Sequence, residues 1–294
     1  MTPFARIGVV GAGLMGHGIA QVAAAGGLRT IVRDLDDSAL DRAKRSIERS
    51  LEKFVEKGAL QAAQRTEALE RLSFTTDLEV MVEADLVIEA IPEDLTLKIE
   101  LWKTLAQITP AETVFATNTS SLAIADMAPA TSRPDRFLGL HFFSPVPMMP
   151  LVEVVRGVET SVETLDRISE FARRLGKEVI VARDAPGFIV NRLLVPYLMD
   201  AVRVVEDGLG TIPDIDLGMK LGCGHPMGPL TLLDLIGLDT ACRVAEVLYR
   251  GLHEERFAPP PLLRRLVAEG HLGRKTGRGF YDYTTEPPVA MKVA

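Results

Sequence analysis

His141 and Glu153 are the residues of this 294-residue chain whose types and spacing best suit acid–base chemistry. His141 stands next to an apolar, proline-containing turn, and Glu153 lies inside an apolar run that is typical of a buried strand. A buried carboxylate is costly unless it has a partner. A histidine on its own is more often a satisfied core residue, but a histidine oriented by a buried carboxylate makes a general base. The pattern therefore indicates an enzyme.

A glycine-rich stretch near the start of the chain, GAGLMG, directly follows a strand-like run and directly precedes a helical one. Glycines at this spacing permit a tight turn, the close approach of a pyrophosphate and close packing of helix on strand, while the helix N-terminus favours the anion. The residues that this motif assigns to a dinucleotide are Gly11, Gly13, Leu14, Met15 and Gly16. The alternative is a glycine-rich turn that binds nothing.

Asp34 ends the next strand-like run, 18 residues after the last glycine of the motif, and this strengthens the dinucleotide interpretation. A carboxylate there would accept hydrogen bonds from the hydroxyl groups of the adenine ribose. Arg33 complicates the choice of cofactor, because an arginine at this place can bind the 2′-phosphate of NADP, whereas Asp34 repels it. We therefore expect NAD in preference to NADP.

A third polar segment, ATNTSSLAI over residues 116–124, directly follows the strand-like run Thr113–Ala116. Loops at the carboxyl ends of strands carry the ligand site in parallel sheets. The small hydroxyl and amide side chains of this loop, which include Asn118 and Ser120, would suit hydrogen bonds to a nicotinamide and to a carbonyl group. The plainer alternative is a polar loop without a ligand, and the residues alone leave both open.

The segments that must position these residues alternate between short strands and longer helices in the first half of the chain. We expect strands at Arg6–Val10, Arg29–Asp34, Asp85–Ala90, Thr113–Ala116, Phe137–Leu140, Leu151–Val155 and Glu178–Val181. We expect helices at Leu14–Ala25, Ser38–Lys57, Gln61–Arg71, Asp94–Ile108 and Ser161–Leu175. This alternation predicts an α/β fold with a Rossmann-type, doubly wound, mainly parallel sheet that has helices on both faces.

The pattern changes at Ala185–Gly187, where proline and glycine interrupt regular structure. Beyond this point we expect a distortion at Pro196, one strand at Gly279–Tyr283 and a frayed tail after it. We expect helices over about 188–208, 213–221, 228–235, 238–251 and 261–269. The chain is thus predicted to form two domains, a Rossmann-type domain over residues 1–185 and a smaller all-α domain over residues 186–294.

Charge and composition exclude several classes of function. The net charge of −7 argues against a general role in binding nucleic acid or an anionic membrane surface. No apolar run is long enough for a transmembrane helix, and the N-terminus lacks the pattern of a signal peptide. Two cysteines, Cys223 and Cys242, are typical of a reducing compartment in which thiols stay free. We therefore expect a cytoplasmic protein, and we expect no metal site.

Many separate motifs, in order along the chain, make a family resemblance specific. They are GAGLMG, IEAIPED from Ile88, TNTSSL from Thr117, HFFSPVP from His141, LVEV from Leu151, APGFIVNR from Ala185, MKLGCGHPMGPL from Met219, IGLDT from Ile236 and LGRKTGRGFYDY from Leu272. Over residues 6–283 the chain resembles the short-chain L-3-hydroxyacyl-CoA dehydrogenases, and most of all the bacterial 3-hydroxybutyryl-CoA type.

The resemblance implies reversible hydride transfer between NAD and the C3 hydroxyl or keto group of a short-chain acyl-CoA. It implies that His141 is the catalytic acid and base and that Glu153 orients it. It also implies further site residues, which are Ser120 and Asn191 for the reacting oxygen and the thioester, Glu93, Lys98, Asn118 and Lys275 for the cofactor, and Ser50 and Lys57 for coenzyme A. A homodimer, and a place in fatty acid metabolism by β-oxidation, are implied as well.

Five cations recur at intervals of three or four residues in the expected helix Ser38–Lys57. They are Arg42, Arg45, Arg49, Lys53 and Lys57. At this spacing they share one stripe of the helix, and polyanionic coenzyme A needs such a stripe in an acidic chain. Acidic residues lie alongside, so a solvated face is the plainer interpretation, and only the resemblance favours coenzyme A.

Two residues depart from the pattern of the family. Ser144 stands where relatives usually have asparagine, and Pro150 where they often have lysine, which bears on rate and chain-length preference more than on reaction type. Two alternatives remain, an NAD(P)-dependent dehydrogenase of a free hydroxy acid and a non-enzymatic relative. The first commonly has a catalytic lysine early in the second domain, where this chain has only Arg192, and the intact site residues argue against the second.

Overall fold

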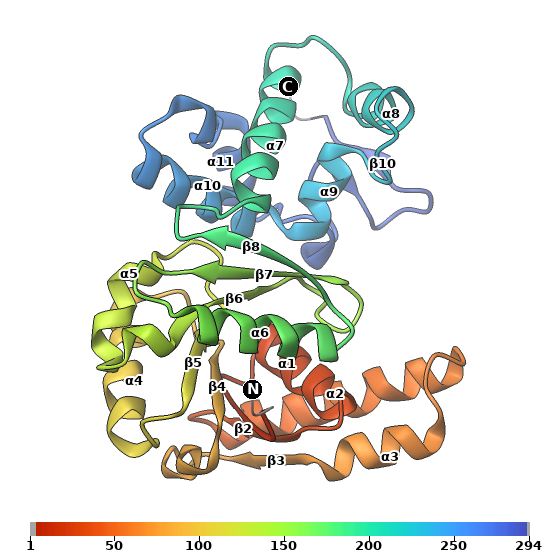
Figure 1. Cartoon of the computed structure of the whole chain (residues 1–294). Helices are drawn as coiled ribbons and strands as arrows, with labels where there is room; N and C mark the ends of the chain where they lie inside the picture. The colour runs from red at the N-terminus through yellow and green to blue at the C-terminus, as the bar shows by residue number, and fades with distance from the viewer. Residues whose placement is uncertain (1–3, 293–294) are drawn as a thin grey trace. The chain divides into compact units, whose positions relative to one another are not determined.

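The computed structural model describes residues 4–292, and the chain divides into two compact units after Ala185 (Figure 1). The first unit is an α/β domain built on one large sheet, and the second unit is mainly helical. The prediction of a doubly wound, mainly parallel sheet followed by a smaller helical domain is confirmed.

Eight strands form the sheet of the first unit, in the order β3-β2-β1-β4-β5-β6-β7-β8. Their bounds are β1 Arg6–Val10, β2 Arg29–Arg33, β3 Leu72–Thr75, β4 Leu86–Glu89, β5 Val114–Thr117, β6 Phe137–Phe142, β7 Leu151–Arg156 and β8 Glu178–Arg183. All neighbouring pairs are parallel except β6 and β7, which are antiparallel. The strand order changes direction between β1 and β4, and open sheets of this kind bind ligands at that point, beyond the carboxyl ends of their strands.

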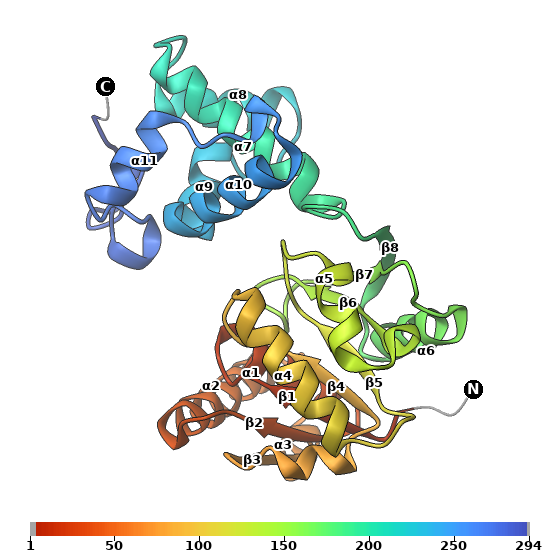
Figure 2. The same ribbon diagram turned by 90° about the vertical axis from the view of Figure 1, so that its left-hand side faces the viewer.

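Helices cover both faces of this sheet (Figures 1 and 2). Their bounds are α1 Leu14–Ala25, α2 Asp37–Glu56, α3 Ala62–Glu70, α4 Leu95–Ile108, α5 Ile124–Met127 and α6 Val162–Arg174. On one face, apolar side chains of α1 and α6 pack into the main core. On the other face, Trp102 of α4 packs its ring against Phe115 and Phe137, with a centroid separation of 5.1 Å in each case. Because both of their faces are buried, the central strands β4, β5 and β6 are largely apolar.

The alternation of side chains along a strand decides which residues share a face. His141 lies four residues after Phe137 on β6, so it points to the face that α4 covers, and the register pairs it with Glu153 on β7. Thr117 lies on the same face two residues after Phe115, and the register pairs it with Glu89 on β4. The polar residues of β4 to β7 therefore meet on one face, near the ends of these strands.

Side-chain caps set where three of the helices begin. Asp36 accepts a hydrogen bond from the N–H group of Ser38 at the start of α2, and Asp94 accepts one from Leu97 at the start of α4. Ser161 accepts one from Thr164 at the start of α6. Each cap satisfies an N–H group that has no partner within its helix, and it thereby fixes where that helix begins.

Two of the strands differ from what the sequence predicts. Strand β3 was not expected, since it pairs only with β2 at the edge of the sheet and its half-buried residues form no apolar run. The tail after Tyr283 was expected to be frayed, but Val289–Ala290 (β10) pairs with Tyr281–Asp282 (β9). Met291 also donates its N–H group to Phe280 at 2.9 Å, so this part of the tail is held against the helical unit.

The second unit consists of helices around its own apolar core. Their bounds are α7 Val190–Glu206, α8 Ile212–Gly222, α9 Pro229–Ile236, α10 Leu238–Leu252 and α11 Pro261–Ala268. Leu198, Leu230, Leu248 and Phe257 are among the buried residues of this core. Pro196 lies inside α7. Within residues 4–292, no helix is long and apolar enough to cross a membrane.

Candidate active site

His141 and Glu153 face each other across neighbouring strands. The Nδ1 atom of His141 lies 2.7 Å from an oxygen of Glu153, whose side chain is fully buried, while the imidazole keeps 8% of its surface exposed. The ring of Phe143 packs on the imidazole at a centroid distance of 4.5 Å. A carboxylate that accepts the Nδ1–H proton makes Nε2 the basic nitrogen and stabilises the imidazolium form. The arrangement can therefore move a proton at Nε2.

The glycine loop between β1 and α1 combines two glycines that the fold requires with one that stands beside open space. Gly11 has a φ of +104°, and a Cβ atom on it would lie 2.5 Å from the carbonyl oxygen of Ala90. A Cβ on Gly16 would lie 1.7 Å from the oxygen of Gly11, so both positions need glycine for the fold itself. A Cβ on Gly13, by contrast, would meet nothing within 4 Å, and within the described residues no side chain caps α1. Open space beside an uncapped helix N-terminus fits an anionic ligand.

Asp34 lies directly beyond the end of β2 and is bonded to the glycine loop. One of its oxygens accepts the N–H group of Ala12 at 2.6 Å, and the other accepts the N–H group of Leu35 at 2.7 Å. Neighbouring Arg33 donates through Nε to the oxygen of Thr76 at 3.2 Å. A carboxylate fixed in this way can accept further hydrogen bonds from a ribose diol.

A buried network of charges lies at the carboxyl ends of β4 and β5. The ammonium group of Lys98, which is 1% exposed, lies 2.5 Å from an oxygen of Glu89 and 3.3 Å from an oxygen of Glu93. Glu89 is fully buried and also accepts hydrogen bonds from the Thr117 hydroxyl at 2.6 Å and the Ile91 N–H group at 2.8 Å. Each carboxylate thus has a cation or several donors as partners, as buried charges require.

Glu93 holds the polar loop after β5. One of its oxygens accepts hydrogen bonds from the Thr119 hydroxyl at 2.5 Å, the Ser121 hydroxyl at 3.0 Å and the N–H group of Ser120 at 3.1 Å. In the same loop, the side-chain oxygen of Asn118 accepts the N–H group of Phe142 at 2.9 Å. The loop is therefore tied to β6 at the residue that follows the catalytic candidate.

The pKa values of the two glutamates of this network are shifted in opposite directions. Burial raises the pKa of Glu89 above its ordinary value, although Lys98 and the hydrogen-bond donors act against this. Burial also acts to raise the pKa of Glu93, but Lys98, Thr119, Ser121 and Ser120 together lower it. Glu93 is therefore the group of the two that is more firmly ionised, and this favours its role as the acceptor of three donors.

Asn191 and Lys275 belong to the second unit. Asn191 lies in the first turn of α7 and is half-buried. Lys275 is nearly half exposed, and its ammonium group lies 2.5 Å from an oxygen of Asp239, close to the backbone of Gly237. Among residues 4–292, no cluster of His, Cys, Asp and Glu side chains is placed to hold a metal ion.

The predicted stripe of cations on α2 is a real surface feature. All five cations are exposed, whereas Leu40, Ile47 and Leu51 form the buried side of the helix. Ser50 is half-buried and Lys57 ends the helix. The N-terminal end of the stripe is partly neutralised, because Arg42 lies 3.9 Å from Asp36.

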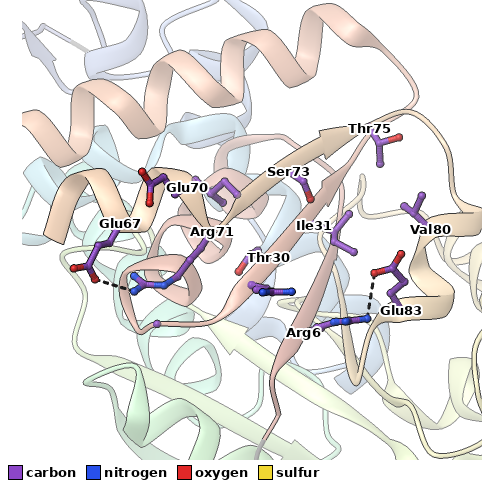
Figure 3. Close-up of a pocket in the computed structure, with 13 residues that line it drawn as sticks. Arg6, Thr30, Ile31, Glu67, Glu70, Arg71, Ser73, Thr75, Val80 and Glu83 are labelled. Carbon is purple, nitrogen blue, oxygen red and sulfur yellow. Dashed lines mark hydrogen bonds and ion pairs between the residues drawn. The ribbon is translucent and has the colours of Figure 1, made fainter. Parts of the chain in front are cut away.

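A hollow of about 710 Å³ in the first unit lies away from these residues (Figure 3). Much of its lining comes from the amino ends of β1, β2 and β3, whereas ligands in such sheets bind beyond the carboxyl ends. Its arginines are largely paired, since Arg6 lies 3.2 Å from Glu83 and Arg71 lies 2.8 Å from Glu67. The hollow therefore does not belong to the dinucleotide site, and its balanced charge does not suit a polyanion.

Sequence reasoning missed two carboxylates that bond to the segments around the candidate active site, Glu89 and Asp184. Glu89 gives the same signal as Glu153, a carboxylate in an otherwise apolar strand, and Lys98 follows it on the next helix. Asp184 accepts hydrogen bonds from Ile124 and Ala125, which lie far away along the chain, so no local pattern indicates this contact.

Comparison with known proteins assigns both units. Residues 6–185 match the family model described as 3-hydroxyacyl-CoA dehydrogenase, NAD binding domain, and residues 187–283 match the C-terminal domain of the same family. The probable 3-hydroxybutyryl-CoA dehydrogenase of Deinococcus radiodurans is 50% identical over 278 residues, which cover 95% of this chain and 100% of that protein.

Solved structures agree with this assignment. The crystal structure of FadB2 from M. tuberculosis has a TM-score of 0.94 at 45% identity, and the match covers 96% of this chain and 100% of that one. The structure of (S)-3-hydroxybutyryl-CoA dehydrogenase PaaH1 from Ralstonia eutropha has a TM-score of 0.92 at 43% identity, with the same coverage. Since both units match in sequence and in fold, the chain belongs to the 3-hydroxyacyl-CoA dehydrogenase family.

Proposed function

We propose that this protein catalyses reversible, NAD-linked oxidation of a short-chain (S)-3-hydroxyacyl-CoA to the 3-oxoacyl-CoA. The observation that carries the proposal is the contact of 2.7 Å between His141 and the fully buried Glu153. The loop with Asn118 and Ser120 is bonded to the same strand, since Asn118 accepts the N–H group of Phe142, the residue after His141. Membership of the family supports the class of substrate, and the relatives named above carry the 3-hydroxybutyryl-CoA name.

The proposed mechanism assigns one task to each residue. Bound NAD supplies the hydride acceptor. In oxidation, Nε2 of His141 takes the proton of the 3-hydroxyl group as the hydride leaves C3, and Glu153 stabilises the imidazolium that results. Ser120 and Asn191 align the reacting oxygen and the thioester by hydrogen bonds, so their contribution is mainly orientation. In reduction, protonated His141 returns its proton to the oxygen on C3.

NAD rather than NADP is the proposed cofactor because of Asp34. Its carboxylate is held against the glycine loop at 2.6 Å from the nitrogen of Ala12, where the adenine ribose is bound in such folds. A 2′-phosphate would meet this negative charge. Arg33 is engaged with the oxygen of Thr76 rather than turned to a phosphate. Glu93, Lys98, Asn118 and Lys275 are the further residues proposed for the cofactor.

Coenzyme A is proposed to bind along α2. The helix exposes five cations on one side, among them Lys57, and Ser50 lies beside this stripe. The phosphates of coenzyme A are polyanionic and the chain is acidic overall, so a local stripe of cations is the feature that such a ligand needs.

We also propose a cytoplasmic homodimer that acts in fatty acid metabolism. Cys223 and Cys242 are both free, as in proteins of a reducing compartment. The helical unit exposes several large apolar side chains, which suit an interface between two copies. They include Leu193, Leu209, Leu217, Leu221 and Leu235.

Oxidation of NADH in the presence of acetoacetyl-CoA tests the proposal. We expect turnover with acetoacetyl-CoA and NADH, much weaker turnover with NADPH, and none with free acetoacetate. Turnover with free keto acids but not with the thioester would favour a dehydrogenase of free hydroxy acids. Absence of turnover with both would favour a non-enzymatic relative. A series of acyl-CoAs of increasing length then defines the chain-length preference, on which Ser144 and Pro150 bear.

A further inference from the structure

Asp184 joins two distant parts of the first unit. It directly follows β8, and its N–H group donates to the oxygen of Arg156 at 3.1 Å, which continues the pairing of β7 with β8. One oxygen of its carboxylate accepts the N–H group of Ile124 at 3.0 Å, and the other accepts the N–H group of Ala125 at 2.8 Å. The end of β8 is thereby bonded to the start of α5.

These two bonds supply a cap that α5 does not provide for itself. The residue before the helix is Ala123, which has no side chain able to accept a hydrogen bond. The first N–H groups of a helix have no partner within it, and a carboxylate is a strong acceptor for them. Asp184 therefore fixes where this short helix begins, and with it the end of the loop that precedes it.

The start of α5 is in contact with the strand that carries His141. Ile124 is fully buried, and a Cβ atom on Gly139 would lie 2.9 Å from its Cδ1 atom. Gly139 is two residues before His141 on β6. Ser120 is four residues before Ile124 in the loop after β5. A shift of Ile124 would therefore disturb both the loop with Ser120 and the packing on β6.

Asp184 also lies at the beginning of the linker to the second unit. The first unit ends at Ala185, directly after Asp184, and Asn191 follows seven residues after Asp184. Glu93 binds the other part of the loop, at Thr119, Ser120 and Ser121. Two carboxylates from outside the loop thus hold it, Glu93 at its middle and Asp184 at the start of the helix that follows it.

We infer that Asp184 is a positioning residue, which ties the loop with Ser120 to the start of the linker that leads to Asn191. The inference rests on the proposed function, in which Ser120 binds the reacting oxygen of the substrate. Asp184 touches neither substrate nor cofactor in this account, and it acts only through the geometry of Ile124 and Ala125.

The test compares Asp184→Ala and Asp184→Asn with two matched controls. Asp126→Asn removes an exposed carboxylate from the same helix, and Ser161→Ala removes the side-chain cap of α6, the helix that follows β7. Two properties are measured, amide hydrogen exchange of residues 119–125 without ligands, and kcat and KM for acetoacetyl-CoA together with the Kd for NADH.

We expect the amide hydrogens of residues 119–125 to exchange at least about fivefold faster in Asp184→Ala than in the wild type. An increase of this size is what the loss of a helix cap typically produces. We expect kcat/KM for acetoacetyl-CoA to fall about 10-fold to 100-fold, with little change in the Kd for NADH. Asp184→Asn, which keeps one acceptor oxygen, should lie between Asp184→Ala and the wild type. Both controls should keep the wild-type kcat/KM.

Unchanged exchange, or a loss of kcat/KM no larger than that in Ser161→Ala, would overturn the inference and leave the proposed function intact. If Asp184→Ala does not fold, the milder Asp184→Asn provides the same comparison. If the wild-type protein does not reduce acetoacetyl-CoA, the proposed function fails, and the catalytic part of the inference fails with it. Hydrogen exchange then decides separately whether Asp184 anchors the loop.

Discussion

Buried ionisable side chains of the first unit gather near the ends of β4 to β7. Glu89, Lys98, His141 and Glu153 are each less than a tenth exposed, and each contacts an opposite charge or a hydrogen-bond partner. Burial of a charge is unfavourable even when it is paired, so such groups are most often retained where they take part in chemistry or hold a group that does. At the scale of single residues, this cluster is where substitutions should affect function most.

Replacement of Glu153 by glutamine should separate catalysis from folding. Glutamine keeps the size and one acceptor oxygen but loses the charge that stabilises the imidazolium form of His141. We expect kcat for acetoacetyl-CoA to fall by about two to four orders of magnitude while the circular dichroism spectrum stays native. Glu163→Gln, an exposed change on α6, is the control and should leave kcat unchanged. A folded Glu153→Gln variant with wild-type kcat would contradict the proposed role.

Glu93 should give the stability of the protein a defined dependence on pH. Its pKa is lowered in the folded protein from an ordinary value of 4.5, so the ionised form adds stability above that pH. This contribution is lost as the pH falls through the lower, folded pKa. We expect Glu93→Gln to be less stable than the wild type at neutral pH, and the difference to shrink as the pH falls below 4.5.

Urea unfolding across this pH range measures the effect. The variant also removes an acceptor of three hydrogen bonds from the loop with Ser120, so part of the difference should persist in acid. Glu163→Gln serves again as the exposed control, with an effect within about 0.5 kcal/mol. A difference that grows as the pH falls would show that Glu93 is not held in its ionised form.

At the scale of elements, the turn between β1 and α1 contains two kinds of glycine. At some positions the fold has no room for a Cβ atom, whereas at Gly13 only a bound ligand would meet one. Gly16→Ala places a Cβ against the backbone of Gly11 and should destabilise the protein by about 1–3 kcal/mol. Gly13→Ala meets open space, so we expect nearly wild-type stability. Its methyl group would instead obstruct the pyrophosphate, and we expect the Kd for NADH to rise about tenfold or more.

Thermal unfolding and a fluorescence titration with NADH measure the two effects on the same samples. The comparison needs no further control, because each glycine variant is the control for the other. A Gly13→Ala variant that binds NADH as tightly as the wild type would show that the pyrophosphate is bound elsewhere.

The elements that could be predicted from the sequence are those with a strong local pattern. β1 and α1 have the predicted bounds, because an apolar run and a glycine turn mark their ends. The edge strand β3 has no apolar run, and β10 is held by its pairing with β9 and by the neighbouring bond from Met291 to Phe280, which exist only in the folded chain. At the site, the pattern around Glu153 predicted its contact with His141, whereas the bonds from Asp184 to α5 depend on the folded chain and leave no local signal.

At the scale of the whole molecule, the helical unit presents an apolar surface. Leu217 and Leu221 lie one turn apart on α8 and are 53% and 76% exposed. Exposed apolar residues grouped in this way are typical of an interface. We expect a species of about twice 32.0 kDa in size-exclusion chromatography with light scattering, and we expect Leu217→Glu with Leu221→Glu to yield monomers.

Val158→Glu, which changes an apolar residue that is 89% exposed in the first unit, is the matched control and should stay dimeric. A wild-type protein that is monomeric at all concentrations would contradict the proposed homodimer. A double variant that remains dimeric would place the interface on another surface of the chain.

We propose that this chain oxidises and reduces acyl-CoA substrates with His141 as its acid and base. The most direct test is a single-turnover measurement of NADH oxidation by acetoacetyl-CoA in the wild type and in His141→Gln, with the Kd for NADH measured on both proteins. We expect the variant to bind NADH like the wild type but to transfer hydride about two to four orders of magnitude more slowly. A variant that binds NADH normally and retains the wild-type rate would contradict it.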